Sequence, residues 1–82
     1  MYTVYVLKSI PFPKSYVGFT DNLDRRLKEH NLGKNNFTRR YIPWKVVYTE
    51  KYDNLLEATK REKSLKTTTG RRFLKKVFAN IV

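Results

Sequence analysis

Three short stretches of the chain have the composition and the alternation that favour β-strands. Residues 2–7 alternate around β-branched and aromatic side chains, and residues 15–20 do so again after a break that contains Pro11 and Pro13. Residues 44–50 form the third such stretch. Because so few residues separate the first two stretches, they are predicted to pair as a hairpin. We therefore expect a three-stranded, mostly antiparallel sheet.

A first amphipathic helix is predicted after the hairpin, over residues 20–33. Thr20 or Asp21 is the expected N-cap, because a short polar side chain satisfies free backbone N–H groups there. Gly33 is the expected end of this helix. The polar and basic residues 34–43 that follow predict a loop.

Two further helices are predicted in the last third of the chain. Residues 54–66 have helical spacing, and Asn54 and Glu57 have the separation of a capping box. Residues 67–70 are expected to break this helix, and residues 71–82 to form the last one. The order β-β-α-β-α-α, with a sheet covered by helices, is an α+β fold.

One arginine stands where the first helix should carry an apolar residue. Leu23, Leu27 and His30 recur at the spacing of one helical stripe, and Arg26 lies on that same stripe. Its neighbour Arg25 lies about 100° further round the helix and is expected to face solvent. Arg26 is therefore expected to point toward the sheet.

Glu62 is the corresponding exception in the second helix. It falls among Leu55, Ala58 and Leu65, which mark the inward stripe. A charge that turns inward costs several kcal/mol unless it is paired or has a function. Two interpretations follow: Arg26 and Glu62 form a structural ion pair, or both belong to a functional site.

The charge of the chain changes the picture more than its other bulk properties. Its 82 residues, 40% of them hydrophobic, are enough for one small domain over residues 1–82. Eighteen Lys and Arg against seven Asp and Glu give a net charge of +11, and the bases concentrate in residues 60–76. Such a field attracts polyanions, so nucleic acid is the expected partner, although a merely solubilising face has the same signature.

Other classes of protein are disfavoured by what the sequence lacks. There is no cysteine, which excludes disulfides and cysteine zinc sites. The first residues do not have the pattern of a signal peptide, and no apolar run approaches the roughly 18 residues that span a bilayer. We expect a cytoplasmic protein that does not bind membranes.

Several single residues are ambiguous when each is taken alone. Tyr5 and Tyr16 are ordinary strand residues by type, and His30 could simply place its charge at the end of a helix. Gly18, inside a predicted strand, indicates either a bulge or a close approach of neighbouring atoms.

Taken together and in order, these residues resemble the GIY-YIG nuclease family. Residues 4–6, Val-Tyr-Val, resemble its first motif with Tyr5 as the motif tyrosine, and residues 16–18, Tyr-Val-Gly, match the second closely. Arg26 lies ten residues after Tyr16, at the place of the family's functional arginine. His30 occurs one turn later, as in some branches. The stretch "EATKRE" is similar to the family's second helix, and its closing Glu62 matches the metal ligand.

The resemblance is greatest to small stand-alone members related to the N-terminal nuclease domain of the repair protein UvrC. It implies hydrolysis of phosphodiester bonds in DNA, in repair, recombination or DNA processing. Glu62 would hold one Mg²⁺ or Mn²⁺, and Arg26 would bind the phosphate. Tyr5 is the first candidate to orient or deprotonate the attacking water, with Tyr16 and His30 as positioning residues.

Two alternatives keep the fold without this activity. The first is a non-catalytic nucleic-acid binder, favoured by Leu74 and Phe19, which replace polar or basic residues common in the family. The second is an accessory subunit of a larger repair or recombination complex. In every case the same exposed bases are expected to contact phosphates: Lys34, Arg39, Arg40, Lys60, Lys63, Lys66, Arg71 and Arg72.

Overall fold

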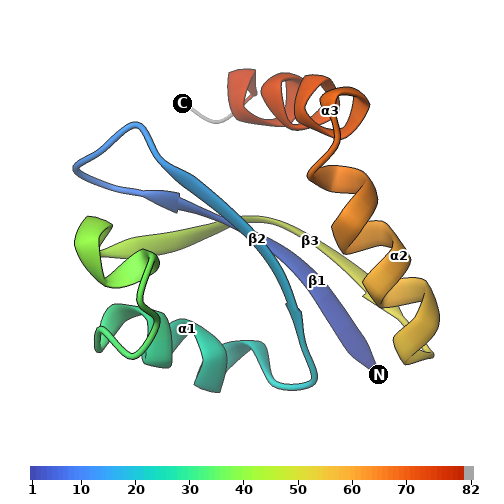
Figure 1. Cartoon of the computed structure of the whole chain (residues 1–82), viewed down its shortest axis with the longest axis horizontal. Helices are drawn as coiled ribbons and strands as arrows, with labels where there is room; N and C mark the ends of the chain where they lie inside the picture. Colours follow the sequence, from blue (N-terminus) through green and yellow to red (C-terminus); the bar gives the residue numbers. More distant parts are fainter. Residues whose placement is uncertain (81–82) are drawn as a thin grey trace.

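A computed structural model of the chain describes residues 1–80. In chain order the elements are β1 (Tyr2–Ser9), β2 (Ser15–Thr20), α1 (Leu23–Asn31), the 3₁₀ helix η1 (Thr38–Tyr41), β3 (Trp44–Tyr52), α2 (Leu55–Leu65) and α3 (Thr68–Ala79). The predicted α+β succession is confirmed (Figure 1). Within these residues, no helix has the length and apolar character needed to cross a membrane.

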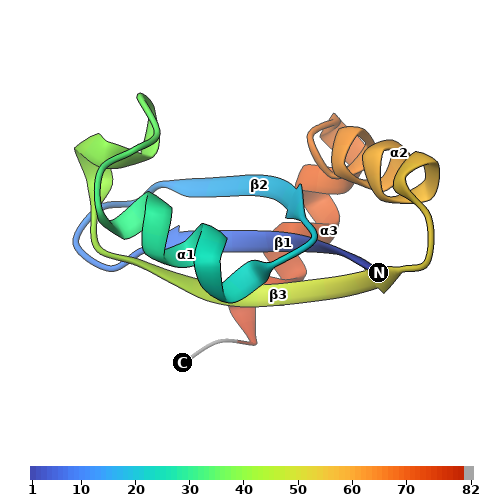
Figure 2. The ribbon, with the colours of Figure 1, turned by 90° about the horizontal axis from the view of Figure 1, so that it is seen from below.

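The three strands form one antiparallel sheet in the order β2-β1-β3. Figure 2 shows β1 between its two neighbours. The predicted hairpin of β1 and β2 is present, and Tyr5 lies opposite Gly18 in β2 and Thr49 in β3. β1 and β3 continue to Ser9 and Tyr52, beyond the predicted strand ends.

Helices cover both faces of the sheet, and alternate residues of β1 supply both cores. Val4 and Val6 pack with Val17 against Ala58, Leu65 and Leu74 of α2 and α3. Tyr5 and Leu7 point the other way, into a second core with Trp44, Leu23 and Leu27. Each fully buried aliphatic side chain contributes about 1.5–3 kcal/mol. The central strand therefore holds the two layers of helices together.

The helix caps agree only in part with the sequence prediction. Asn22, and not Thr20 or Asp21, caps α1: its Oδ1 accepts a hydrogen bond from the backbone N–H of Arg25 at 3.1 Å. The Thr20 hydroxyl instead accepts from the backbone N–H of Asn22 at 3.1 Å and forms the turn before the helix. Asn54 caps α2 as predicted.

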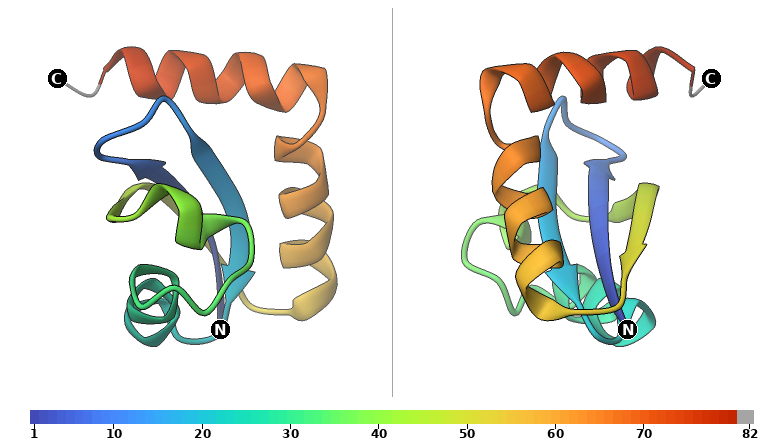
Figure 3. Two further views of the ribbon diagram at one scale, coloured as in Figure 1. Left: turned by 60° about the vertical axis from the view of Figure 1, so that its left-hand side comes forward. Right: turned by 90° about the vertical axis from the view of Figure 1, so that its right-hand side faces the viewer.

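The last helix begins earlier than predicted. Thr67 is its N-cap, so residues 68–70 are helical and only Lys66 and Thr67 separate α2 from α3. Figure 3 shows α3 running across the end of α2. At this corner Gly70 is buried, and a Cβ there would lie 2.5 Å from the Leu65 Cα. Ile81 and Val82, which the prediction included, lie outside the described residues.

A polar cluster ties α2 to β3. The Glu50 carboxylate accepts two hydrogen bonds from Arg61, at 2.8 and 3.0 Å, and further ones from the hydroxyls of Tyr48 and Tyr52. Partial burial raises the pKa of Glu50, but these donors outweigh it and lower that pKa to about 2. Glu50 is therefore ionised at neutral pH and, through Arg61, holds α2 beside the sheet.

Candidate active site

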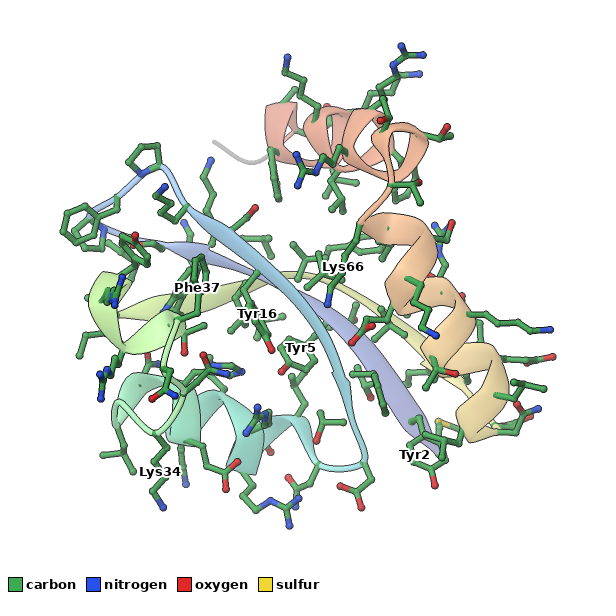
Figure 4. All side chains as sticks on the ribbon, viewed as in Figure 1. Tyr2, Tyr5, Tyr16, Lys34, Phe37 and Lys66 are labelled. Atoms are coloured by element: carbon green, nitrogen blue, oxygen red, sulfur yellow. The ribbon has the colours of Figure 1, made fainter. Side chains whose placement is uncertain are left out.

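Tyr5 and Tyr16 project from neighbouring strands onto the face that α1 covers. Tyr5 lies in the central strand and is buried, whereas Tyr16 lies in the edge strand and is partly exposed. Their ring centroids are 6.3 Å apart, and Figure 4 shows the two rings next to each other. The hairpin thus brings the two tyrosines together, as the sequence predicted.

The absence of a side chain at Gly18 leaves the space that the Tyr5 ring occupies. A Cβ at position 18 would lie 2.7 Å from Tyr5 Oη and 3.0 Å from a ring carbon of Tyr16, closer than packed atoms approach. The irregular register of the sheet lies between Val6 and Leu7, away from this glycine. Of the two predicted reasons for Gly18, close approach is therefore the one that applies.

A buried hydrogen-bonded network extends from the Tyr5 hydroxyl. Tyr5 Oη lies 2.9 Å from His30 Nε2, and His30 Nδ1 lies 2.8 Å from the Thr38 hydroxyl. The Thr38 carbonyl in turn accepts from Trp44 Nε1 at 2.8 Å. His30 and Thr38 are both completely buried, so this network holds the ring of His30 in one orientation.

The network is electrically neutral at pH 7. Burial, together with the nearby Arg26, lowers the pKa of His30 to about 4. Burial also raises the pKa of Tyr5 to about 12, with Tyr16 and Glu62 acting in the same direction and Arg26 against them. His30 is thus a neutral member of the site, and its interpretation as a charge at a helix end is wrong.

The neutral ring of His30 donates to one hydroxyl and accepts from the other. Arg26 lies beside the Tyr5 hydroxyl and, as a guanidinium, can only donate. If Tyr5 O–H donates to Nε2, both lone pairs of the hydroxyl stay free for such a donor, whereas the opposite tautomer leaves one. In the first arrangement, Nδ1–H of His30 donates to Thr38.

The two adjacent arginines have different surroundings, as their helical positions predicted. Arg26 Nη1 donates to Glu29 Oε1 at 3.1 Å, with both side chains about two-thirds buried. Arg25 forms only a surface pair with Asp21 at 3.3 Å. The structural ion pair between Arg26 and Glu62, one of the two interpretations, is not formed, and each group is paired within its own helix. Arg26 is held toward Tyr5 without Glu62.

Glu62 reaches the site from the other layer of the fold. Helix α2 packs on β1 and β2 with Ala58 and Leu65 buried in the opposite core, while Leu55, predicted to face inward, is 48% exposed. From the sequence, Tyr5 and Tyr16 would be expected to project onto one sheet face that carries both Arg26 and Glu62, and for Glu62 this expectation is wrong. Because β2 is an edge strand, the charge of Glu62 still acts on Tyr5.

The Glu62 carboxylate has the chemistry of a ligand for a hard cation. It is mostly shielded from solvent, and its ion pair is with Lys66 one turn later, at 3.6 Å. Among residues 1–80 there is no group of three or more His, Cys, Asp or Glu side chains that could enclose a metal. A single carboxylate suits Mg²⁺, which retains several waters and takes phosphate oxygens as ligands.

A basic groove lies beside Glu62. Its volume is about 790 Å³, and it runs between the β1–β2 turn, β2 and α3. Its lining contains five bases and no acid, over an apolar floor that includes Leu65, Leu74 and Phe78. The bases are Lys14, Lys66, Arg71, Arg72 and Lys75. Lys66 belongs both to this groove and to the ion pair of Glu62, so the groove adjoins the site.

The remaining predicted phosphate contacts fall into two places. Lys34, Arg39 and Arg40 are exposed in the loop and in η1 that follow α1. Lys60 and Lys63 are exposed on α2 and do not line the groove. All eight predicted bases are exposed, so each is available to a phosphate.

The comparison with protein families decides among the classes of protein that share such a sheet. A model of the GIY-YIG catalytic domain matches residues 1–76. The chain belongs to the GIY-YIG family. Domains of the GIY-YIG family are in general nucleases, with nucleic acids as substrates, and they commonly use a divalent metal.

Within the GIY-YIG family, the chain is similar to small proteins named UPF0213. One, from Natronomonas pharaonis, is 38% identical over 78% of this chain and 75% of its own length. Another, from Clostridium perfringens, is 42% identical over 80% and 71%. The solution NMR structure of a UPF0213 protein from Bacillus halodurans aligns with a TM-score of 0.56 and 30% identity, covering 96% of this chain and 84% of that one.

The two departures from the GIY-YIG pattern lie away from the tyrosines. Leu74 is buried in the core under α3, and Phe19, opposite Val4 in the sheet, packs against that same core. Both side chains therefore serve packing on the face opposite to Tyr5.

Thr38 is the residue of this site that the sequence did not reveal. It lies in residues 34–43, which were predicted to be a polar loop, but it is buried as the partner of His30. Asn35 holds it in place by accepting from its backbone N–H at 3.0 Å. No periodic signal exists in so short a helix, so only the structure shows this contact.

The depressed pKa of His30 predicts a loss of stability in mild acid. Between pH 6.5 and pH 4 the unfolded chain gains a proton on His30 that the folded chain excludes. The free energy of unfolding should therefore fall as pH falls through this window, by about 3 kcal/mol in total. The same linkage for Glu50 acts lower, between about pH 4.5 and pH 2. Denaturant titrations at a series of pH values measure both.

His30 is the only histidine in the chain, so its ring protons give an unambiguous NMR titration. We expect its midpoint near pH 4 in the folded protein, and near 6.5 in denaturant. A folded-state midpoint at or above 6.5 would contradict the neutral network.

Proposed function

We propose that the chain is a metal-dependent endonuclease that hydrolyses phosphodiester bonds in DNA, in repair, recombination or DNA processing. The observation that supports this most is the convergence of Tyr5, Tyr16, Arg26 and His30, with the Glu62 charge acting on the same hydroxyl. Phosphodiester hydrolysis needs a water to be oriented and negative charge to be stabilised, and this cluster offers a group for each.

Arg26 is suited to the scissile phosphate. Its pair with Glu29 uses one nitrogen, Nη1, and leaves other donors of the planar fork available. A guanidinium can bind two oxygens of one phosphate and meet the charge that grows on them in the transition state. Glu29 holds the fork in place.

Tyr5 and His30 are suited to the attacking water. With a pKa of about 12, Tyr5 is protonated at neutral pH, so its hydroxyl orients a water and is not a preformed base. His30 Nε2, 2.9 Å from Tyr5 Oη, accepts the hydroxyl hydrogen bond and so fixes the direction in which Tyr5 presents its lone pairs to the water. Tyr16 packs on the His30 ring, with centroids 4.9 Å apart, and fixes its position.

Glu62 is the residue that would hold the cation, Mg²⁺ or Mn²⁺. Its carboxylate fits, because it is shielded and its ion-pair partner, Lys66, is a flexible surface lysine that can turn to a phosphate instead. When bound, such a cation polarises the phosphate and stabilises the leaving oxygen. Lys66 and the groove would then hold the adjoining strand.

A non-catalytic binder or an accessory subunit of a larger complex would also need the groove. Neither role explains why Tyr5, His30 and Thr38 form a buried network below the phosphate-binding arginine. The network favours the enzyme.

The test is a cleavage assay with purified protein. Plasmid, single-stranded and branched DNA, and an RNA of matched sequence, are incubated with Mg²⁺, with Mn²⁺ or with EDTA. We expect DNA cleavage with either cation and none with EDTA. Binding without cleavage under all these conditions would support the non-catalytic binder and refute the proposal.

A further inference from the structure

A row of aromatic rings leads from the tyrosine pair to the surface. The ring of Phe37 lies 6.3 Å from that of Tyr16, with the planes 28° apart. Tyr41 follows at 5.4 Å from Phe37, and Phe12 at 5.5 Å from Tyr41. We call these four residues the aromatic row. Figure 4 shows Phe37, Tyr16 and Tyr5 following one another along one line.

The outer members of the row are open to solvent. Phe12 and Phe37 are 45% and 46% exposed, although each touches another ring of the row. They come from the turn between β1 and β2 and from the residue that precedes η1. Single exposed apolar residues are common, but connected rings that begin at a candidate active site form a surface suited to a partner.

Positive charge surrounds the row. Lys14 Nζ lies over the ring of Tyr41, 5.4 Å from its centre, and Arg39 and Arg40 are exposed in η1. None of residues 30–49 is acidic. Aromatic faces combined with bases are the recognition chemistry of single-stranded nucleic acid, whose bases stack on the rings while the phosphates meet the cations.

We propose that the aromatic row binds unpaired bases, so that the substrate carries a single-stranded segment beside the scissile phosphate. This inference rests on the proposed function and specifies its substrate class. Within a duplex the faces of each base are covered by its neighbours, and only unpaired bases can lie on protein rings. Because Tyr16 belongs both to the row and to the site, a strand stacked on Phe37 would lead directly to Arg26.

The test compares two ligands on the full chain without added metal, so that no cleavage is needed. One is a single-stranded oligonucleotide with a fluorescent adenine analogue, and the other is a blunt hairpin duplex of equal length. At fixed salt we expect tighter binding of the single strand. Phe37→Ala should weaken single-strand binding about tenfold or more and change duplex binding less than twofold.

Two variants separate stacking from a structural role. Phe37→Leu keeps apolar volume without a ring face, and we expect it to lose most of the same affinity. Phe73→Ala is the matched control, since Phe73 is an exposed phenylalanine of α3 that packs on Tyr48 and Arg61, outside the row. It should bind as the unchanged chain does, and thermal melts verify that each variant is folded.

Every result distinguishes the inference from the proposed function. If neither nucleic acid binds, the proposed function itself fails. If both ligands bind equally, or if Phe37→Leu binds as the unchanged chain does, the row is not a stacking surface. Vesicles containing phosphatidylserine and a polyglutamate peptide are tested in parallel. Tighter binding of either than of the single strand, lost in Phe37→Ala, would assign the row to a membrane or an acidic protein and overturn the inference.

Discussion

Replacing Arg26 by alanine is expected to slow DNA cleavage by a factor on the order of 10²–10³, about 3–4 kcal/mol of transition-state stabilisation. Arg26 lies beside the Tyr5 hydroxyl, where a phosphate must come to be attacked. Affinity for DNA should fall only modestly, because many other bases remain. Arg26→Lys should restore little activity, since a point charge does not reproduce the planar fork. Single-turnover cleavage and equilibrium binding measure the two effects separately.

Arg25→Ala is the control, because it removes the same charge one residue away. Arg25 pairs only with exposed Asp21, so we expect nearly normal cleavage and slightly weaker binding. Thermal melts must accompany the assay. Arg26→Ala leaves Glu29, which is partly exposed, without its partner, so the variant should remain folded. An unfolded Arg26→Ala, or equal losses at positions 25 and 26, would refute the assignment of Arg26 to the site.

Replacing Glu62 by glutamine is expected to lower the rate of DNA cleavage by a factor on the order of 10³ or more. The affinity for DNA should stay equal or increase. Glutamine keeps the shape of the side chain but removes the charge that would hold the cation, which supplies several kcal/mol to such reactions. The neighbouring Lys66 is also released from its ion pair and adds to the positive groove. Cleavage and binding are measured on the same labelled DNA.

Glu57→Gln is the matched control, since it removes a carboxylate from the exposed side of the same helix. It should cleave normally. Mn²⁺ binding, followed by the EPR signal of the free ion in the presence of DNA, should be lost in Glu62→Gln and kept in Glu57→Gln. A Glu62→Gln protein that cleaves as fast as the unchanged chain would disprove the metal assignment.

The strands and the first two helices could be predicted from the sequence because alternation, helical spacing and caps act locally. The errors arose where several residues could serve equally well or where distant contacts decided. Thr20, Asp21 and Asn22 can all cap a helix, and the turn that Thr20 forms selects Asn22. Glycine has a low helix propensity, so Gly70 was predicted to lie outside the last helix. Its close packing against Leu65 nevertheless places it within α3.

The site was predictable to the extent that single elements define it. Helical geometry predicted that Arg26, and not Arg25, points toward the sheet. The predicted hairpin placed Tyr5 and Tyr16 on neighbouring strands. The sequence could not show that Glu62 belongs to the layer behind an edge strand, because strand order is a property of the whole sheet. It also could not show Thr38 or the aromatic row, whose members come from segments without periodicity.

The contact between Gly70 and Leu65 packs the backbones of α2 and α3 directly against each other where the two helices meet. Glu62 lies on α2, while Arg71, Arg72 and Lys75 lie on α3. A nucleic-acid strand bound by the bases of α3 would therefore reach Glu62 at a constant number of nucleotides from the bound segment. The distance between the cut and the bound segment would then be set by the backbone packing between the two helices, independently of base sequence.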